Sequence, residues 1–151
     1  MLHSSDVRQD HDDQPPEAGS AAVEFVMLSA VLLVPILYFV LTMGTLQGAS
    51  FAAAGAADHA AKVFVRSGDL SSARAAADAV ARVAVADFGM EPGRAGVTVL
   101  CDRQDCLEAG AAVTVTVAVE VSLPFAPSFD GNPPATARAV ASSTQIAGRF
   151  R

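Results

Sequence analysis

Three kinds of reactive side chain stand out in this 151-residue sequence: a carboxylate inside an apolar run, a pair of cysteines, and one histidine beyond the N-terminal segment. The carboxylate is Glu24, which lies a few residues inside the stretch EAGSAAVEFVMLSAVLLVPILYFVLTMG. A charge within a membrane-spanning helix costs about 3 kcal/mol or more unless a partner or the membrane interface relieves it. Glu24 is therefore the residue whose presence most needs a chemical explanation.

The histidine, His59, offers little for catalysis. It lies in an alanine-rich segment where a solvated position is expected, and Asp58 beside it does not share its helix face because adjacent helical residues point in different directions. The sequence contains no glycine-rich phosphate loop, nucleophile elbow or HExxH motif. We therefore expect a protein that is not an enzyme and that uses no cofactor, metal ion or small-molecule substrate.

The two cysteines, Cys101 and Cys106, lie in the segment VLCDRQDCLEAG. With four residues between them, a disulfide would close a short loop, and both lie beyond the apolar run, where an oxidising compartment suits an even number of cysteines. A metal or redox site is disfavoured because the spacing matches neither zinc motifs nor CxxC. The pattern favours a structural disulfide and leaves reduced thiols as the alternative.

The charge distribution argues against a nucleic-acid partner. The chain is 52% hydrophobic and 17% charged, and its formal net charge of -6 comes largely from residues 1–19, which hold five acids and one base. From Asp58 onward, ten acids face nine bases, so this region is nearly neutral. A nearly neutral region with no cluster of bases has no basic face for nucleic acid.

The N-terminal half divides into a polar leader and a long helix. Residues 1–19 are rich in acids and contain two prolines, so they cannot build a core and are predicted to be disordered. Residues 22–43 form an apolar run long enough to cross a membrane, with a bend expected at Pro35. We expect this helix to continue past the membrane toward Arg66, which gives an N-terminal helix over residues 20–66.

A second helix is predicted over residues 70–88 of a small extracytoplasmic domain that spans 68–151. Asp69 is its candidate N-cap and Gly89 its stop. The spacing places Arg74, Asp78 and Arg82 on one polar face. The opposing apolar face is expected to hold Ala76, Ala77, Val80, Val83 and Ala84.

Three segments of the same domain have strand patterns: AGVTVLC, AAVTVTVAVEVSLPF and, more weakly, ATARAVASSTQIAG. In the second, the valines from Val113 to Val121 alternate with other residues, which predicts a half-buried antiparallel strand whose valine face receives the second helix. The fold class is thus α+β, with a second helix packed on a small antiparallel sheet. In the loop over 124–134, Phe125 and Phe129 are expected to pack at the sheet edge rather than form an exposed contact.

Two simple readings of the apolar run compete with a more specific one. A secretory signal peptide cut near ASFAAAGAA would need a positively charged start and a shorter apolar region. An uncleaved signal anchor could hold Glu24 at the interface, where its carboxylate would reach the headgroups. This second reading explains the charge but not its position relative to Gly19.

That position follows a recognisable pattern. The small residue Ser20 follows Gly19, Glu24 stands five residues after the glycine, and the aromatic Phe25 comes directly after it, before an unbroken apolar helix. This arrangement resembles the prepilin peptidase site of type IV prepilins, and it is similar to the TadE-like pseudopilins of the tight-adherence (Flp) pilus system. The resemblance covers the N-terminal motif and, beyond it, only the layout of helices, strands and a cysteine pair. The leader here is acidic, whereas leaders of this family usually carry basic residues.

The resemblance implies that a prepilin peptidase cleaves after Gly19, because an enzyme at the membrane face needs access to the backbone that a side chain would obstruct. Cleavage would remove residues 1–19 and leave Ser20 with a new α-amino group. Glu24 of a neighbouring subunit would then be the natural partner of that ammonium. The small residues from Ser20 to Ala22 would permit close helix approach.

The sequence therefore predicts a non-enzymatic pseudopilin or minor-pilin-like subunit of a tight-adherence type IV pilus or a related secretion apparatus. Its expected partners are the membrane, a prepilin peptidase and other pilin or pseudopilin subunits bound through the N-terminal helix. It would cross the bacterial cytoplasmic membrane once, with the C-terminal domain outside, and incorporation into a surface pilus is left open. The alternative is a membrane-tethered extracytoplasmic binding module with an uncleaved signal anchor.

Overall fold

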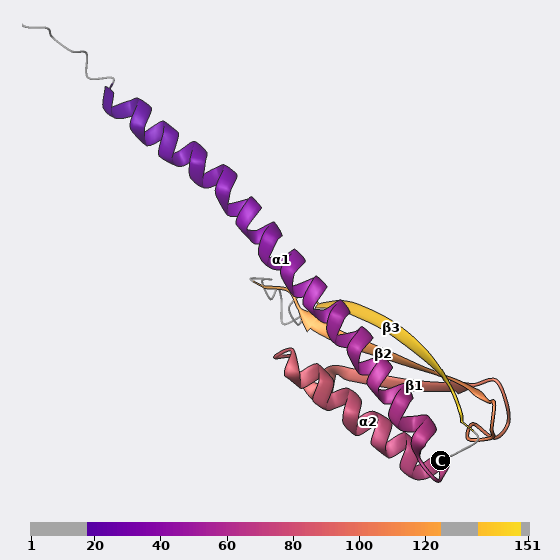
Figure 1. Ribbon diagram of the computed structural model, residues 1–151. Helices are drawn as coiled ribbons and strands as arrows, with labels where there is room; N and C mark the ends of the chain where they lie inside the picture. The colour runs from indigo at the N-terminus through magenta and orange to yellow at the C-terminus, as the bar shows by residue number, and fades with distance from the viewer. Residues whose placement is uncertain (1–17, 125–135, 149–151) are drawn as a thin grey trace, which may run out of the picture. The chain divides into compact units, whose positions relative to one another are not determined.

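The computed structural model describes residues 18–124 and 136–148 of the chain. It is an α+β fold, which confirms the predicted class of a long helix, a second helix and a small antiparallel sheet. The elements in chain order are α1 (Ala18–Arg66), α2 (Leu70–Asp87), the 3-10 turn η1 (Pro92–Arg94), β1 (Ala95–Cys101), β2 (Ala112–Ser122) and β3 (Thr136–Ile146) (Figure 1). The predictions for residues 1–17 and for Phe125 and Phe129 lie outside the described residues.

Helix α1 is continuous over 49 residues and ends at Arg66, as the sequence predicted. Pro35 lies inside it, and the expected bend there stays a prediction. From Val23 to Met43 its large apolar side chains are exposed on every side. By length and composition this helix can cross a membrane.

The chain divides into two compact units, Met1–Leu37 and Tyr38–Arg151, and the second holds the C-terminal part of α1 with α2 and the sheet. Helix α2 begins where Asp69 caps it: the Asp69 Oδ1 accepts hydrogen bonds from the backbone N–H groups of Ser71 at 3.0 Å and Ser72 at 2.9 Å. Hydrogen bonds from the two serine hydroxyls and from these N–H groups hold the pKa of Asp69 well below its ordinary value. The helix ends at Asp87, and Gly89 follows with a φ of 71°, a conformation that favours glycine.

The sheet has the strand order β1-β2-β3, and both pairings are antiparallel. Strand β1 matches the predicted segment, and β2 and β3 each extend over 11 residues. In the β1–β2 register Val97 lies opposite Val117, and in the β2–β3 register Val117 lies opposite Ala141. These pairs place small and β-branched residues on one common face of the sheet.

The core of this domain lies against that face. The valines of β2 are buried as the alternation predicted, with Val113, Val115, Val117 and Val119 fully inaccessible. Both helices contribute to the same buried cluster. The sequence pattern had predicted that only the second helix packs on the valine face of the sheet. The helical members are mostly alanines: Ala49, Ala53, Ala56, Ala57, Ala60, Ala61 and Phe64 of α1, and Ala73, Ala77, Ala81 and Val85 of α2.

The predicted apolar face of α2 was wrong in one respect. Val83 is 61% exposed, and the buried stripe recurs every four residues from Ala73 to Val85. Of the predicted face, Ala77 is fully buried and Ala84 is partly buried against the core cluster. The reason is that the cluster brings together two helices whose buried residues are mainly alanines, so the side of α2 with the smallest side chains permits the closest approach.

Enlarging one alanine of this stripe should therefore destabilise the domain. We expect Ala77→Leu to lower the free energy of unfolding by about 1–3 kcal/mol, because the added atoms have no space in a fully buried position. The matched control is Val83→Leu, an exposed site on the same helix, which should change it by less than about 0.5 kcal/mol. Denaturant unfolding of the full chain in detergent, followed by circular dichroism, measures both, and equal stabilities for the two variants would contradict this packing.

Candidate functional site

The residues of the predicted processing motif all lie in the first two turns of α1. Ala18 begins the helix, so Gly19 and Ser20 are already helical, and Glu24 and Phe25 follow about one turn later. Ser20 and Glu24 line the same open hollow on the helix surface, as their spacing of four residues requires. The other residues of this hollow are Val23, Met27, Leu28 and Val31.

The Glu24 side chain is exposed and has no charged neighbour among the described residues. Phe25 beside it is 70% exposed, and no formal charge follows in the sequence until Asp58. Within residues 18–124 and 136–148, each of the four ion pairs lies at Asp58 or beyond, and none involves Glu24. The folded chain thus offers this carboxylate no partner among the described residues, although it lies at the start of an apolar helix.

The histidine region is arranged as the sequence predicted. His59 is exposed, and the Asp58 carboxylate is directed to Lys62, one turn further on, with 2.6 Å between Oδ2 and Nζ. The hydrogen bond and the charge of Lys62 lower the pKa of Asp58 below its ordinary value. In the described part of the chain, no group of three or more His, Cys, Asp or Glu side chains is placed to hold a metal ion.

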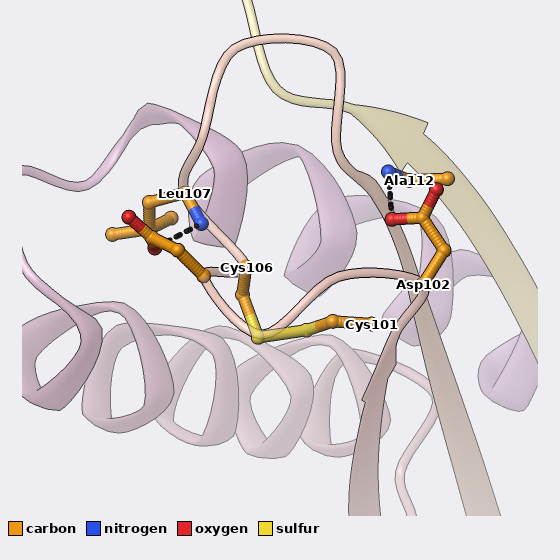
Figure 2. The surroundings of a disulfide bond; sticks show 6 residues. Cys101, Asp102, Cys106, Leu107 and Ala112 are labelled. Carbon is orange, nitrogen blue, oxygen red and sulfur yellow. Dashed lines mark hydrogen bonds between the residues drawn. A yellow bond between two sulfur atoms is a disulfide. The ribbon is translucent and has the colours of Figure 1, made fainter.

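The two cysteines form a disulfide at the end of β1, with 5.3 Å between their Cα atoms (Figure 2). Cys106 is buried in the domain core, where it contributes an apolar group. Asp102 closes the loop behind it: its backbone N–H donates to the Ala112 carbonyl at 3.1 Å, and its Oδ1 accepts the Ala112 N–H at 2.8 Å. A second carboxylate, that of Asp105, accepts the Leu107 N–H at 2.9 Å.

Polar contacts hold the loop between β1 and β2 in place. Two of its carboxylates bind backbone N–H groups, and Arg103 pairs with Glu108 at 3.3 Å. The loop is also fixed to the end of β3, because the Gly110 N–H donates to the Ala147 carbonyl and the Ala147 N–H donates to the Ala111 carbonyl, both at 2.9 Å. The disulfide therefore closes a loop that is already held at both ends.

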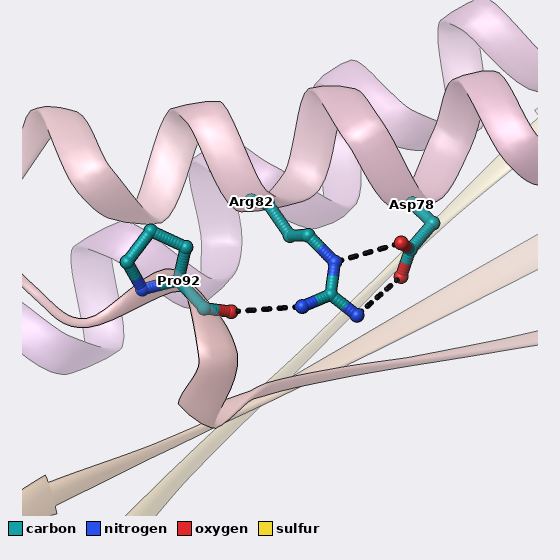
Figure 3. Close-up of polar contacts among 3 residues, drawn as sticks. All are labelled: Asp78, Arg82 and Pro92. Carbon is teal, nitrogen blue, oxygen red and sulfur yellow. Dashed lines mark hydrogen bonds and ion pairs between the residues drawn. The ribbon is translucent and has the colours of Figure 1, made fainter.

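Arginines fix the other end of the domain. Arg82 of α2 bonds the Asp78 carboxylate through Nε at 2.7 Å and donates to the Pro92 carbonyl at 3.3 Å, which ties α2 to η1 (Figure 3). The hydrogen bond and the charge of Asp78 raise the pKa of Arg82. Arg94 pairs with Glu91 at 2.9 Å and donates to the Ser122 hydroxyl at 2.7 Å.

A hollow of about 590 Å³ lies beside Arg94 and was not predicted from the sequence. One side is formed by Gly44, Thr45 and Gly48 of α1, and the others by residues 88–91 and 120–122. Gly48 faces the Met90 side chain, which lies 3.6 Å from where a Cβ would be. Three segments distant in sequence, 44–48, 88–94 and 120–122, form this hollow, so no local pattern could have indicated it.

Comparisons with protein-family models, with curated proteins and with solved structures find no significant match to this chain. Functional inference therefore depends on the chain's own residues: the motif at the start of α1, the exposed apolar helix and the disulfide-closed domain.

The disulfide yields a direct prediction. In full-length protein isolated without reductant, Cys101 and Cys106 should resist alkylation, and reduction should restore labelling and lower the free energy of unfolding by about 2 kcal/mol, the chain-entropy value for so short a loop. The double variant Cys101→Ser, Cys106→Ser is the control, because its stability should not respond to reductant. Rapid labelling of freshly isolated, unreduced protein would contradict an oxidised pair.

Proposed function

We propose that this chain is a non-enzymatic pseudopilin or minor-pilin-like subunit of a tight-adherence type IV pilus or a related secretion apparatus. The observation that carries the proposal is the register of Gly19, Ser20, Glu24 and Phe25 at the start of one continuous apolar helix that leads into a small α+β domain. In this proposal α1 anchors the chain in the bacterial cytoplasmic membrane, and the disulfide-bonded domain lies outside the cytoplasm.

The position of the motif supports a specific chemistry. Cleavage after Gly19 would make Ser20 the first residue of α1, so a new ammonium would stand at the helix end that already carries the positive pole of the helix dipole. A carboxylate from a neighbouring subunit is the complementary group. Glu24 is exposed and unpaired among the described residues, and it lies one turn from Ser20, so it is available for that contact.

The magnitude of this contact is large enough to matter for assembly. Two opposite unit charges 4 Å apart attract by about 4 kcal/mol at an effective dielectric constant of about 20. Part of this gross attraction is offset by the removal of both groups from water. The same desolvation makes a mismatch costly, because an ammonium buried without its carboxylate has no compensating partner.

The first test concerns processing. Protein purified from its native membrane should begin at Ser20, as measured by N-terminal sequencing and intact mass. A matched variant, Gly19→Val, should retain Met1 because its side chain obstructs the backbone before the scissile bond. A native protein that begins at Met1, or near Gly55 as a cleaved signal peptide would leave it, would refute the assignment.

The second test separates a pilus subunit from the alternative, a membrane-tethered binding module with an uncleaved anchor. Glu24→Gln should still insert in the membrane but lose co-purification with the pilus components and surface piliation, since a neutral amide replaces the partner of the ammonium. Cleavage is followed in parallel to separate a processing defect from an assembly defect. The control Glu120→Gln removes an exposed carboxylate of β2 and should leave assembly unchanged.

Normal piliation and co-purification of the Glu24→Gln variant would contradict the proposed role of this residue in assembly. They would instead favour the tethered module, in which an interfacial carboxylate has no partner and is dispensable.

A further inference from the structure

The hollow beside Arg94 has a charged wall and an apolar wall. Arg94, Glu91 and Glu120 belong to the charged wall. On the apolar wall Phe88 is 50% exposed, and Met90 is partly buried against the domain core. A ligand that matches both walls carries charge at one end and apolar groups at the other.

Helix α1 leaves the hollow open on its side. A Cβ built at Gly44 would meet nothing within 4 Å, and one at Gly48 would come no closer than 3.6 Å to the Met90 side chain. The hydroxyl of Thr45, which also lines the hollow, donates back to the Leu41 carbonyl of its own helix at 2.9 Å. The hollow of about 590 Å³ therefore has room for a bound group next to α1.

The Arg94 guanidinium is held in place and still has donors to spare. Its Nε pairs with the Glu91 carboxylate at 2.9 Å, and its Nη1 donates to the Ser122 hydroxyl at 2.7 Å. Among the residues that the structure describes, Nη2 has no hydrogen-bond partner, and the side chain is 43% exposed. A guanidinium fixed in this way is suited to an oxygen anion such as a phosphate.

The charges of the hollow call for a cation beside that anion. One arginine faces two glutamates there, which gives a formal charge of -1. Glu91 is paired with Arg94, whereas Glu120 takes part in no ion pair within the described part of the chain. A ligand with a phosphate and a neighbouring ammonium would satisfy both Arg94 and Glu120, and a purely anionic ligand would leave Glu120 unmatched.

The position of the hollow along α1 indicates where such a ligand is found. The apolar run over residues 22–43 rises by about 33 Å, which matches a hydrocarbon core of about 30 Å. Gly44 is the next residue, and the helix rises by about 6 Å from Gly44 to Gly48. One headgroup layer is about 5–7 Å thick. In the proposed function this side of the hollow therefore lies at the level of the phospholipid headgroups.

We propose that the hollow beside Arg94 binds the headgroup of a membrane phospholipid that carries an ammonium next to its phosphodiester, as phosphatidylethanolamine does. The phosphate contacts Arg94, the ammonium contacts Glu120, and the glycerol end lies against Phe88. The proposal rests on the proposed function only in that α1 crosses a membrane. It requires neither cleavage after Gly19 nor other subunits, so the two proposals can fail separately.

The test measures lipid selectivity by native mass spectrometry of the full chain in detergent. Phosphatidylethanolamine, phosphatidylglycerol and phosphatidylcholine with identical acyl chains are added in equal amounts, so that lipid held only by the apolar helix is the same for all three. We expect about threefold more phosphatidylethanolamine adduct than either other adduct, as for one partly exposed charge contact. The same spectra give the chain mass, which reports independently whether residues 1–19 have been removed.

Variants locate the bound lipid. Arg94→Gln should lower the phosphatidylethanolamine adduct about threefold, and Glu120→Gln should abolish its excess over phosphatidylglycerol. Gly44→Leu fills the hollow without removing a polar contact and should lower the same adduct. The matched controls are Arg74→Gln on the exposed surface of α2 and Gly55→Leu at an open position of α1 outside the hollow, and both should retain the wild-type selectivity. Thermal unfolding of each variant distinguishes a lost site from a lost fold.

A further arm separates a lipid from a soluble phosphodiester. Glycerophosphoethanolamine has the same headgroup without acyl chains, and it should not displace the lipid at equal concentration. Displacement by it, equal adducts of the three lipids, or unchanged selectivity in a folded Gly44→Leu variant would overturn the proposal. Selective binding by a native chain that still begins at Met1 would leave this site standing and refute the pilin assignment. A native chain that begins at Ser20 and shows no selectivity would have the opposite meaning.

Discussion

The folded domain depends on close approach between alanine-lined helices and a valine-lined strand. Ala53, Ala57 and Ala60 of α1 and Ala77 of α2 are completely buried with the valines of β2 in one cluster. Few large side chains take part, so the stability of this core comes from many short contacts rather than from a few large apolar groups. Such a core tolerates little change in volume, and this constraint fixes the side of α1 that faces the domain. The opposite side, with Phe51, is thereby left exposed.

The ends of the domain are secured by polar contacts of a different kind. At one end the Cys101–Cys106 disulfide and the Asp102–Ala112 hydrogen bonds close the connection between β1 and β2. At the other end Arg82 ties α2 to η1, and Arg94 reaches β2. Charged side chains in these positions bind backbone groups, the Ser122 hydroxyl or one another. These contacts hold α2, η1 and the strand ends in fixed positions.

Sequence patterns predicted most of this fold because its elements have strong local signals. The valine alternation, the cap at Asp69 and the stop at Gly89 each depend on a few neighbouring residues, and all three are present in the structure. The buried side of α2 was not predictable in the same way, because its alanines give almost no periodic signal and the choice depends on which side can approach α1. The hollow beside Arg94 was missed for a similar reason, since distant segments form it. The motif around Glu24 was identified from spacing alone, and its role stays a prediction.

The folded chain leaves two features of α1 without partners among the described residues. One is the Glu24 carboxylate at the start of the apolar run, and the other is the uncharged outer side that continues to Phe51. A monomer in solution would expose both, at the cost of a large apolar surface in water. A monomer in a membrane would cover only the apolar run and would leave Glu24 to the interface and Phe51 to water. In the proposed function α1 lies against the helices of other subunits, and such an arrangement would supply a partner for the Glu24 carboxylate and a cover for the exposed side of α1.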